Sequence, residues 1–314
     1  MTQPPRIAVL LPCYNEENCI AGVIAAFRQS LPAAQIYVYD NNSTDKTARI
    51  ARDSGAHVRT ETYQGKGNVV RRMFSDIEAD IYVIADGDGT YDASDAPALI
   101  GKLTEGNLDM VVGSRVETET KAYRHGHKFG NYFLTAMVKN LFGFGFTDIL
   151  SGYRVMSRRY VKSFPIVSSG FEIETEMSVH ALQLRLPVAE VPTHYGVRPD
   201  ESPSKLNTWR DGFRILFTIF GLTASERPRL LFGSVSVILA LISVFSAIPL
   251  LITYIQTGLV PRLPTALFCV GTMLLAAMVL GFGWLLHVVT RGRIEAKRLA
   301  YLSHQSVVGN DASS

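Results

Sequence analysis

Ile81-Tyr-Val-Ile-Ala-Asp-Gly-Asp88 is an apolar run of strand length that ends in two carboxylates. Earlier in the chain, Ile7 to Leu11 leads into Tyr14-Asn-Glu16 in the same way. Ile36 to Tyr39 likewise leads into Asp40-Asn-Asn42. Short apolar runs that stop at polar turn residues are typical of strands buried on both faces. The sequence therefore predicts three buried strands, each with polar groups at its carboxyl end.

Segments with helical periodicity separate these runs, and the same pattern continues beyond them. The expected helices are Glu16–Arg28, a segment from Ser43 or Thr44 to about Ser54, Lys66–Ala79 and Asp95–Leu103, and the further strands are Val58–Thr62 and Met110–Val112. This alternation predicts an α/β domain with a mostly parallel sheet covered by helices. In such sheets ligands bind beyond the carboxyl ends of the strands, where the polar clusters lie.

Two segments contain residue types that indicate a chemical role. Asp86 and Asp88 flank one small residue, and Mg²⁺ or Mn²⁺ is commonly held by one or two carboxylates plus substrate phosphates. Gly65-Lys-Gly-Asn68 opens a helix, where glycines permit close approach and the helix N-terminus with Lys66 favours an anion. The spacing of a P-loop is absent. Acidic turn residues and an ordinary glycine turn are the competing interpretations.

Composition narrows the functional class. The 314 residues carry a formal net charge of +3, which argues against a nucleic-acid partner. The three cysteines Cys13, Cys19 and Cys269 indicate neither a disulfide framework nor a zinc site, so a reducing compartment is the simpler interpretation. The first 17 residues lack the features of a signal peptide. We therefore expect the soluble part of the chain in the cytoplasm.

Leu230 to Ile255 and Thr265 to Thr290 are long apolar runs. With a helical rise of about 1.5 Å per residue, each exceeds a hydrocarbon core of about 30 Å. They predict two transmembrane helices, with a pair of buried core helices as the alternative. Basic residues flank the pair on both outer sides, while the loop between them holds only Arg262. The positive-inside rule then predicts a multi-pass protein of the inner (cytoplasmic) membrane, with the N-terminal domain and the C-terminus cytoplasmic.

A different pattern precedes the first run. Between Asn207 and Leu222, five apolar residues share one helical face: Trp209, Phe213, Leu216, Phe217 and Phe220. This predicts an amphipathic helix in the membrane interface, with a helix packed on the soluble core as the alternative. The expected organisation is a soluble domain at 1–206, this helix and a linker at 207–228, two spans within 229–291, and a basic segment with a disordered tail at 292–314.

Six motifs occur in an order that resembles family 2 glycosyltransferases. They are Leu11-Pro-Cys-Tyr-Asn-Glu-Glu17, Asp40-Asn-Asn-Ser-Thr-Asp45, Gly65-Lys-Gly67, Asp86-Gly-Asp88, Gly113-Ser-Arg115 and Asp148-Ile-Leu-Ser-Gly-Tyr-Arg154. The chain is most similar to the polyprenyl- or dolichyl-phosphate sugar transferases over about residues 6–220, and the two spans suit the bacterial members. The resemblance implies a GT-A fold and an inverting, non-processive, Mg²⁺- or Mn²⁺-dependent transfer of sugar from a UDP- or GDP-sugar to a polyprenyl phosphate, for cell-envelope glycan or glycolipid assembly.

The resemblance also implies roles for single residues. The nucleotide sugar is expected at Pro12, Tyr14, Glu16, Asp40, Lys66, Gly67, Asp86, Glu174 and Glu176. Asp40 would hold the base, and the two glutamates lie on an acidic helix that closes the sugar pocket. The metal is expected at Asp86 and Asp88. The acceptor phosphate is expected at Arg115, Arg124, Lys128, Arg198 and Lys205. Asp88, Arg115 and Asp148 are the expected catalytic residues.

The chain departs from the family pattern at three places. Asn41 stands where many relatives have a second Asp, which leaves the choice between UDP and GDP open. Thr90 replaces a Gln of several dolichyl-phosphate relatives, so a third protein ligand for the metal is unassigned. The Gln-x-x-Arg-Trp signature of processive synthases is missing, which disfavours chain elongation.

The role of Asp148 depends on the acceptor. In relatives that use hydroxyl acceptors, an acid at this position resembles the catalytic base. A phosphate monoester has a second pKa of about 6 and is already ionised at pH 7, so it requires no strong base. With that acceptor, Asp148 would orient other groups or hold Arg154.

Three other functions remain open. The first keeps the fold but uses a sugar or lipid hydroxyl as acceptor, with Asp148 as general base. The second is a nucleotidyltransferase, which would normally show a glycine-rich basic loop where this chain has Tyr14-Asn-Glu16. The third is a non-catalytic membrane protein, against which the paired Asp86 and Asp88 argue. The expected partners are a nucleotide sugar, a polyprenyl phosphate lipid and the membrane. A homo-oligomer is compatible with the sequence.

Overall fold

The computed structural model describes residues 4–117, 139, 146–170, 172–196, 221 and 227–306. Four expected acceptor contacts lie outside these residues: Arg124, Lys128, Arg198 and Lys205. The expected interfacial helix at 207–222 also lies outside them, apart from Gly221. The chain divides into two compact units, one formed by Met1–Ile215 with Ala296–Ser314 and the other by Leu216–Glu295.

In the first unit, the described residues form a seven-stranded sheet in the order β3-β2-β1-β4-β6-β5-β7. The strands are β1 (Ile7–Cys13), β2 (Gln35–Asp40), β3 (His57–Thr60), β4 (Ile81–Ile84), β5 (Met110–Glu117), β6 (Arg154–Ser157) and β7 (Val188–Tyr195). Among them, β6 alone runs antiparallel, between β4 and β5. The five expected strands are present, and the expected α/β class with a mostly parallel sheet is confirmed.

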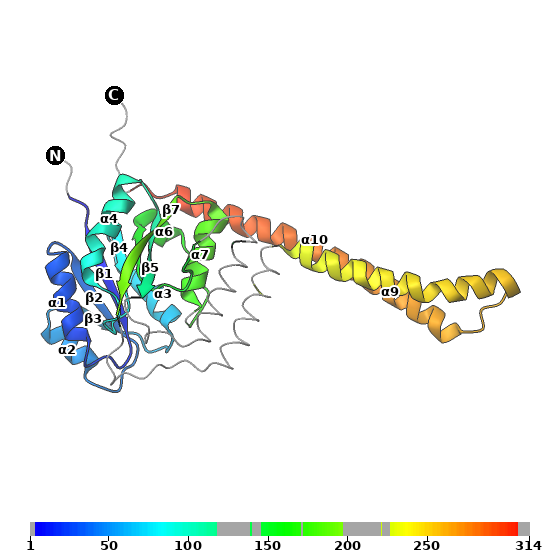
Figure 1. Ribbon diagram of the computed structural model, residues 1–314, viewed down its shortest axis with the longest axis horizontal. Coiled ribbons are helices and arrows are strands. Elements are labelled where there is room, and N and C mark those ends of the chain that lie inside the picture. Colours follow the sequence, from blue (N-terminus) through cyan, green and yellow to red (C-terminus); the bar gives the residue numbers. More distant parts are fainter. Residues whose placement is uncertain are drawn as a thin grey trace, which may run out of the picture. The chain divides into compact units, whose positions relative to one another are not determined.

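Helices cover both faces of this sheet (Figure 1). One face carries α1 (Ile20–Ser30), α2 (Thr47–Asp53) and the 3-10 turn η1 (Ala93–Asp95) with α4 (Ala96–Glu105), and the other carries α3 (Lys66–Asp76), α6 (Arg158–Ser163) and α7 (Ile173–Leu184). Phe27 of α1 and Leu99 of α4 pack with Val9 and Val83 of the central strands in one buried cluster. Burial on both faces explains why the strands are uninterrupted apolar runs.

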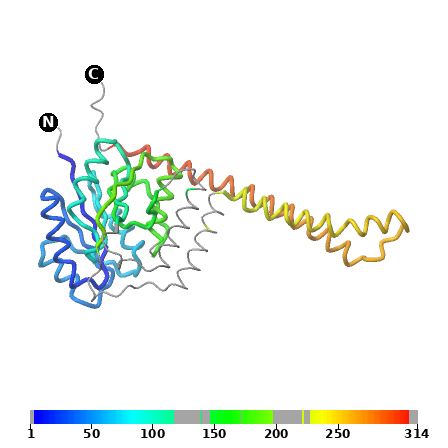
Figure 2. The backbone as a smooth tube through the Cα atoms, in the orientation of Figure 1, coloured from blue at the N-terminus to red at the C-terminus, as the bar shows by residue number. Residues whose placement is uncertain are grey.

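The second unit contains most of two long helices, α9 (Pro228–Thr257) and α10 (Leu263–Leu302). They run side by side (Figure 2). Ser236 Oγ donates to the carbonyl of Ala276 at 2.8 Å, and Ser243 Oγ donates to that of Cys269 at 2.7 Å. Both helices are long and apolar enough to cross a membrane, and most of their apolar side chains are exposed. This exposure contradicts the alternative of buried core helices.

The helix that contains the second expected span extends past it. The expected span ends at Thr290, followed by a basic segment and a disordered tail, and α10 continues to Leu302, so the first part of the expected basic segment is helical. Residues from Ala296 onward belong to the unit that contains the sheet. The reason is that Arg291, Arg293 and the charges after them end an apolar run without ending a helix, because Lys, Arg and Glu are good helix formers.

Candidate active site

Hydrogen bonds connect the loop that follows β1 to the segment that follows β2. The Asn15 backbone N–H donates to Ser43 Oγ at 2.9 Å, and Asn15 Oδ1 accepts from the Thr44 N–H at 2.8 Å. The Glu16 N–H donates to Thr47 Oγ1 at 2.8 Å. Asn15 has a φ of 53°, a left-handed conformation that asparagine tolerates better than most residues. The predicted contact Pro12 is half-buried within β1, Tyr14 is half-buried on the loop after it, and Glu16 on the same loop is buried.

Asp40, the last residue of β2, is buried with 4% of its surface exposed. Its Oδ2 accepts from the Ser43 N–H at 3.1 Å. Its Oδ1 has no hydrogen-bond partner among the described residues. A buried carboxylate oxygen without a donor is costly, so this atom marks a place where a ligand donor would be favourable.

The side-chain amide of Asn41 forms its hydrogen bonds with the protein backbone. Its Nδ2 donates to the carbonyls of Glu61 and Tyr63 at 3.1 and 2.9 Å, and its Oδ1 accepts from the Gly65 N–H at 2.7 Å. An aspartate cannot make the two donated bonds. Asn41 therefore fixes the segment that leads to Lys66, a role that the sequence did not reveal.

Lys66 lies between two carboxylates from different elements. Its Nζ is 2.5 Å from Asp86 Oδ1, after β4, and 2.5 Å from Glu174 Oε1, on α7. Burial alone would lower the pKa of Lys66, but the attraction of Asp86 and then Glu174 outweighs it and raises the pKa above the ordinary lysine value. Burial also raises the pKa of Glu174, and Asp86 adds to the rise, because one cation cannot neutralise two carboxylates.

Gly152 closes one side of this group. A Cβ at this position would lie 2.9 Å from Asp86 Oδ2 and 3.1 Å from Lys66 Nζ. The Gly152 N–H donates to the Tyr91 hydroxyl at 2.9 Å. The predicted donor residues Lys66, Asp86 and Glu174 are thus brought together, with a glycine of the 148–152 loop against them.

The second acid of the pair is held separately. Asp88 is 4% exposed, and its Oδ1 accepts from the Thr90 N–H at 3.1 Å and from Thr90 Oγ1 at 2.7 Å. Thr90, noted above as a departure, therefore orients Asp88. The intervening Gly87 is required because a Cβ there would collide with Cys13 Sγ.

Asp86 and Asp88 fit a divalent cation in the chemistry of their donors. Both offer the carboxylate oxygens that Mg²⁺ and Mn²⁺ prefer. Among the residues that the structure describes, no group of three or more His, Cys, Asp or Glu side chains is arranged to hold a metal ion. Two carboxylates alone would leave a bound cation open to further oxygen ligands.

Glu176 and Gly67, the glycine in the first turn of α3, both contact the segment 167–169. Glu176 accepts from the Val167 and Ser168 N–H groups, both at 2.9 Å, rather than joining Lys66. The Gly67 N–H donates to the carbonyl of Ser169 at 3.0 Å. A Cβ at Gly67 would collide with the backbone of 168–169. The glycine is therefore explained by this close approach of the chain, and the sugar contact of Glu176 remains a prediction.

Arg115 and Asp148 form a bidentate ion pair. Arg115 Nε donates to Asp148 Oδ2 and Arg115 Nη2 to Asp148 Oδ1, both at 2.7 Å. The guanidinium also lies over the ring of Tyr195, 5.5 Å from its centroid. The Asp148 N–H donates to Glu190 Oε1 at 3.1 Å. The interpretation that Asp148 holds Arg154 is wrong, because its carboxylate binds Arg115.

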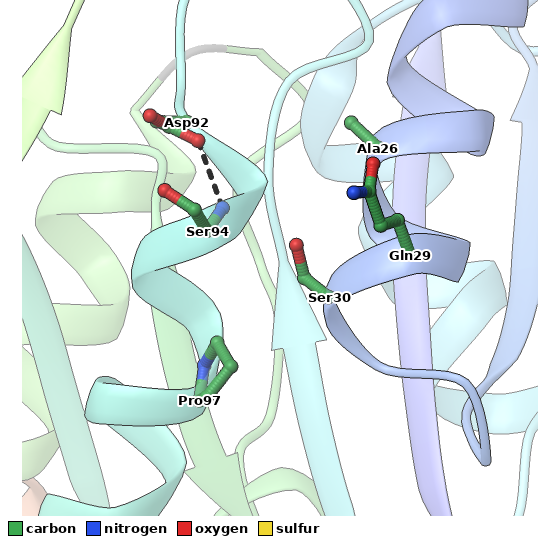
Figure 3. Close-up of a pocket in the computed structure, with 6 residues that line it drawn as sticks. All are labelled: Ala26, Gln29, Ser30, Asp92, Ser94 and Pro97. Atoms are coloured by element: carbon green, nitrogen blue, oxygen red, sulfur yellow. Dashed lines mark hydrogen bonds between the residues drawn. The ribbon is translucent and has the colours of Figure 1, made fainter.

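A surface pocket of about 420 Å³ lies between α1 and the η1–α4 segment (Figure 3). It is lined by Ala26, Gln29, Ser30, Asp92, Ser94 and Pro97. The carboxylate of Asp92 accepts from the Ser94 N–H at 2.8 Å and so caps η1. None of the predicted site residues lines this pocket, and its polar groups do not converge on a common point.

Known proteins match this chain over the region that contains these motifs. The family model "Glycosyl transferase family 2" matches residues 8–164, half of the 314-residue chain. Glycosyltransferase AglJ of Haloferax volcanii is 38% identical over 237 residues, covering 75% of this chain and 78% of AglJ. The chain belongs to glycosyl transferase family 2.

Further similarities place this family 2 glycosyltransferase among known relatives. It is 26% identical over 224 residues to dolichyl-phosphate hexose transferase of H. volcanii, covering 71% of this chain and 96% of that protein. The crystal structure of Mycobacterium tuberculosis glucosyl-3-phosphoglycerate synthase is similar, with a TM-score of 0.56 and 25% identity, covering 69% of this chain and 81% of that one. That enzyme has also been solved with Mn²⁺, UDP-glucose and phosphoglyceric acid, and this structure matches at 24% identity with a TM-score of 0.56. The GT-A fold implied by the motifs is confirmed.

Proposed function

We propose that this family 2 glycosyltransferase transfers one sugar, with inversion, from a UDP- or GDP-sugar to a polyprenyl phosphate. The product is a polyprenyl-phosphate sugar for cell-envelope glycan or glycolipid assembly. The relationship to dolichyl-phosphate hexose transferase and the two apolar helices support a lipid phosphate as acceptor.

The observation that carries the proposed donor site is Asp40 Oδ1, which has no hydrogen-bond partner among the residues that the structure describes. It lies at the carboxyl end of β2, the edge where parallel sheets bind their ligands. An N–H of a nucleobase or an O–H of a ribose would satisfy this buried atom. Tyr14 and Glu16, on the loop that is hydrogen-bonded to the segment after β2, complete the proposed nucleotide contacts.

The diphosphate is proposed to lie at Lys66, Asp86 and Asp88. Asp86 and Asp88 would hold Mg²⁺ or Mn²⁺, as the Mn²⁺ and UDP-glucose complex of the mycobacterial enzyme supports. A bound cation would neutralise negative charge on the departing diphosphate. Lys66, held charged by its two carboxylates, supplies a fixed positive charge at the same place.

The acceptor is proposed to bind beside Arg115. A phosphate monoester is largely ionised at pH 7 and attacks without a strong base, so the main barrier is the approach of two anions. Arg115 offsets that repulsion with paired donors suited to phosphate. Asp148 uses both carboxylate oxygens to hold this guanidinium, which favours an orienting role over that of a base. Arg124, Lys128, Arg198 and Lys205 remain proposed acceptor contacts.

The active site is proposed to face the cytoplasm at the inner membrane. Arg227 and Arg229 precede the first apolar run, and Arg291 and Arg293 follow the second. The short loop between α9 and α10 contains a single basic residue, Arg262. The positive-inside rule then places both outer flanks on the cytoplasmic side.

Membranes that contain the full chain test this function with radiolabelled UDP- and GDP-sugars plus undecaprenyl or dolichyl phosphate. The expected result is label in an acid-labile lipid fraction that disappears with EDTA. Label only in polymer or glycoconjugate would overturn the proposal, and label in an acid-stable lipid would favour a hydroxyl acceptor. The Asp148→Asn variant separates the two roles of Asp148, since near-full turnover with lipid phosphate is incompatible with a base.

A further inference from the structure

Arg154, at the start of β6, is the largest fully buried side chain among the described residues, with 0% of its surface exposed. Its Nε donates to the carbonyl of Ser151 at 2.9 Å, and its Nη2 donates to that of Ile149 at 2.8 Å. Its Nη1 donates to Ser178 Oγ on α7 at 2.9 Å. Burial lowers the pKa of this guanidinium, so the protein retains a charged group at a place that disfavours charge.

The loop that Arg154 binds touches both halves of the proposed site. At its start, Asp148 forms the ion pair with Arg115 on the proposed acceptor side. Near its end, Gly152 lies against Asp86 and Lys66 on the donor side. Arg154 bonds two carbonyls between these points, so its position limits how far Asp148 and Gly152 can move relative to each other.

A third connection runs through α7. Ser178 Oγ accepts from Arg154 and donates to the backbone carbonyl of Glu174 at 3.0 Å. Glu174, one turn earlier, is the carboxylate that holds Lys66. A single guanidinium therefore reaches the loop of the acceptor pair and the helix of the donor group.

We propose that Arg154 is a positioning residue that sets the separation between the acceptor-side pair, Arg115–Asp148, and the donor-side group, Lys66–Asp86–Glu174. The assignment of these two halves rests on the proposed function. A planar guanidinium donates in several fixed directions at once, which a lysine ammonium on a flexible stem cannot reproduce. Glycosyl transfer requires attacking and leaving groups at a defined distance, and a misplacement of about 1 Å can reduce the rate about 100-fold.

The test compares Arg154→Lys and Ser178→Ala with Arg159→Lys. Arg159 is the matched control, a largely buried arginine that binds Asp109, which directly precedes β5 at the amino end of the sheet. We expect Arg154→Lys to lower kcat about 100-fold in folded enzyme. Ser178→Ala should raise KM for the donor and leave KM for the acceptor unchanged. Arg159→Lys should lower Tm but keep kcat and both KM values.

Each variant is compared with wild type on whichever acceptor the wild type uses, so a wrong acceptor assignment does not alter the outcome. Calorimetric binding of UDP and GDP adds a measurement that needs no turnover, with affinity reduced about tenfold, or about 1.4 kcal/mol, in Arg154→Lys and unchanged in Arg159→Lys. If Arg154→Lys does not fold, Ser178→Ala decides alone. The proposal is wrong if Arg154→Lys and Ser178→Ala lower Tm as the control does while kcat, both KM values and nucleotide affinity stay at wild-type levels.

Discussion

One carboxylate and a group of carboxylates lie at opposite ends of the parallel strands, and they differ in how many donors from the described residues surround them. At the amino end of β5, Asp109 is fully buried and accepts from Ser157 Oγ, from two nitrogens of Arg159 and from the Tyr301 hydroxyl. At the carboxyl ends, Asp86 and Glu174 both form an ion pair with Lys66. Nearby, Asp40 Oδ1 has no partner among the described residues.

This difference separates a carboxylate whose partners are supplied by the folded chain from carboxylates that we propose bind a ligand. Asp109 receives its donors from the folded chain, including the end of α10, so its charge is compensated without any ligand. At the other end, Asp86 and Glu174 both pair with Lys66, and burial together with the charge of Asp86 raises the pKa of Glu174. A divalent cation with a nucleotide would supply the missing positive charge and donors.

Asp109→Asn is expected to have the largest effect on stability. It leaves the guanidinium of Arg159 without its carboxylate in a largely buried place. Losing one partner of a buried pair lowers the free energy of unfolding by about 3–5 kcal/mol. Chemical denaturation measures this change, while KM for the donor should not move. Asp53→Asn is the control, since its pair with Arg49 is exposed and worth little.

Asp86→Asn should give the converse result. Turnover is expected to fall about 100-fold or more, because a charge that organises Lys66 and the proposed cation is lost. The free energy of unfolding should not decrease, since the change removes one of two carboxylates that compete for one lysine. Transfer assays and thermal unfolding of the same preparation measure both. A loss of stability as large as that of Asp109→Asn would contradict the distinction between the two groups.

The sequence predicted the part of this arrangement that depends on local pattern. Strands such as Ile81–Ile84 appear as apolar runs because helices cover both faces of the sheet, and the polar residues after them mark its ligand-binding edge. Asp40, Lys66 and Asp86 were all predicted as donor contacts on this basis or by resemblance, and their place at this edge of the sheet agrees with the pattern. The confirmed family then follows from motif order.

The missed features depend on contacts between distant residues. The ring of donors around Asp109 joins Ser157, Arg159 and Tyr301, and no local periodicity connects these positions. The partner of Asp148 was misjudged for the same reason, because Arg115 lies 33 residues away and Arg154 only six. The sequence indicated no end for the helix of the second span, because hydropathy marks the end of an apolar run rather than the end of a helix.

Tyr301→Phe tests the contribution of the α10 end to the Asp109 group. It removes the hydroxyl that donates to Asp109 Oδ2 at 2.7 Å but keeps the ring, which lies 5.0 Å from the Arg159 guanidinium. A hydrogen bond to a charged group contributes about 1.5–3 kcal/mol, so a loss of about 2 kcal/mol is expected. Denaturation curves measure it. Tyr301→Phe in the Asp109→Asn background should cost clearly less, and equal costs in both backgrounds would mean that the two residues act independently.

His180 extends the comparison to a neutral buried group. Both of its ring nitrogens are buried without a partner among the described residues, and the ring packs against Tyr160 and Phe164. Burial, with a smaller contribution from Lys297, lowers the pKa of His180 from 6.5 to about 3. The folded state therefore binds fewer protons than the unfolded state between these values, and its stability falls as pH drops below 6.5.

Between pH 6.5 and 5.5 this linkage amounts to about 1 kcal/mol, the smallest effect considered. His180→Phe keeps an aromatic ring and removes the titration, so its free energy of unfolding should depend less on pH by that amount. His57→Phe is the control, because His57 is exposed and the same substitution there replaces no buried imidazole. Denaturation at a series of pH values measures both variants. If the free energy of unfolding of His180→Phe depended on pH as strongly as that of the wild type, the folded protein would accommodate a charged imidazole here. A lack of partners at a buried group would then distinguish the two kinds of carboxylate but would not apply to His180.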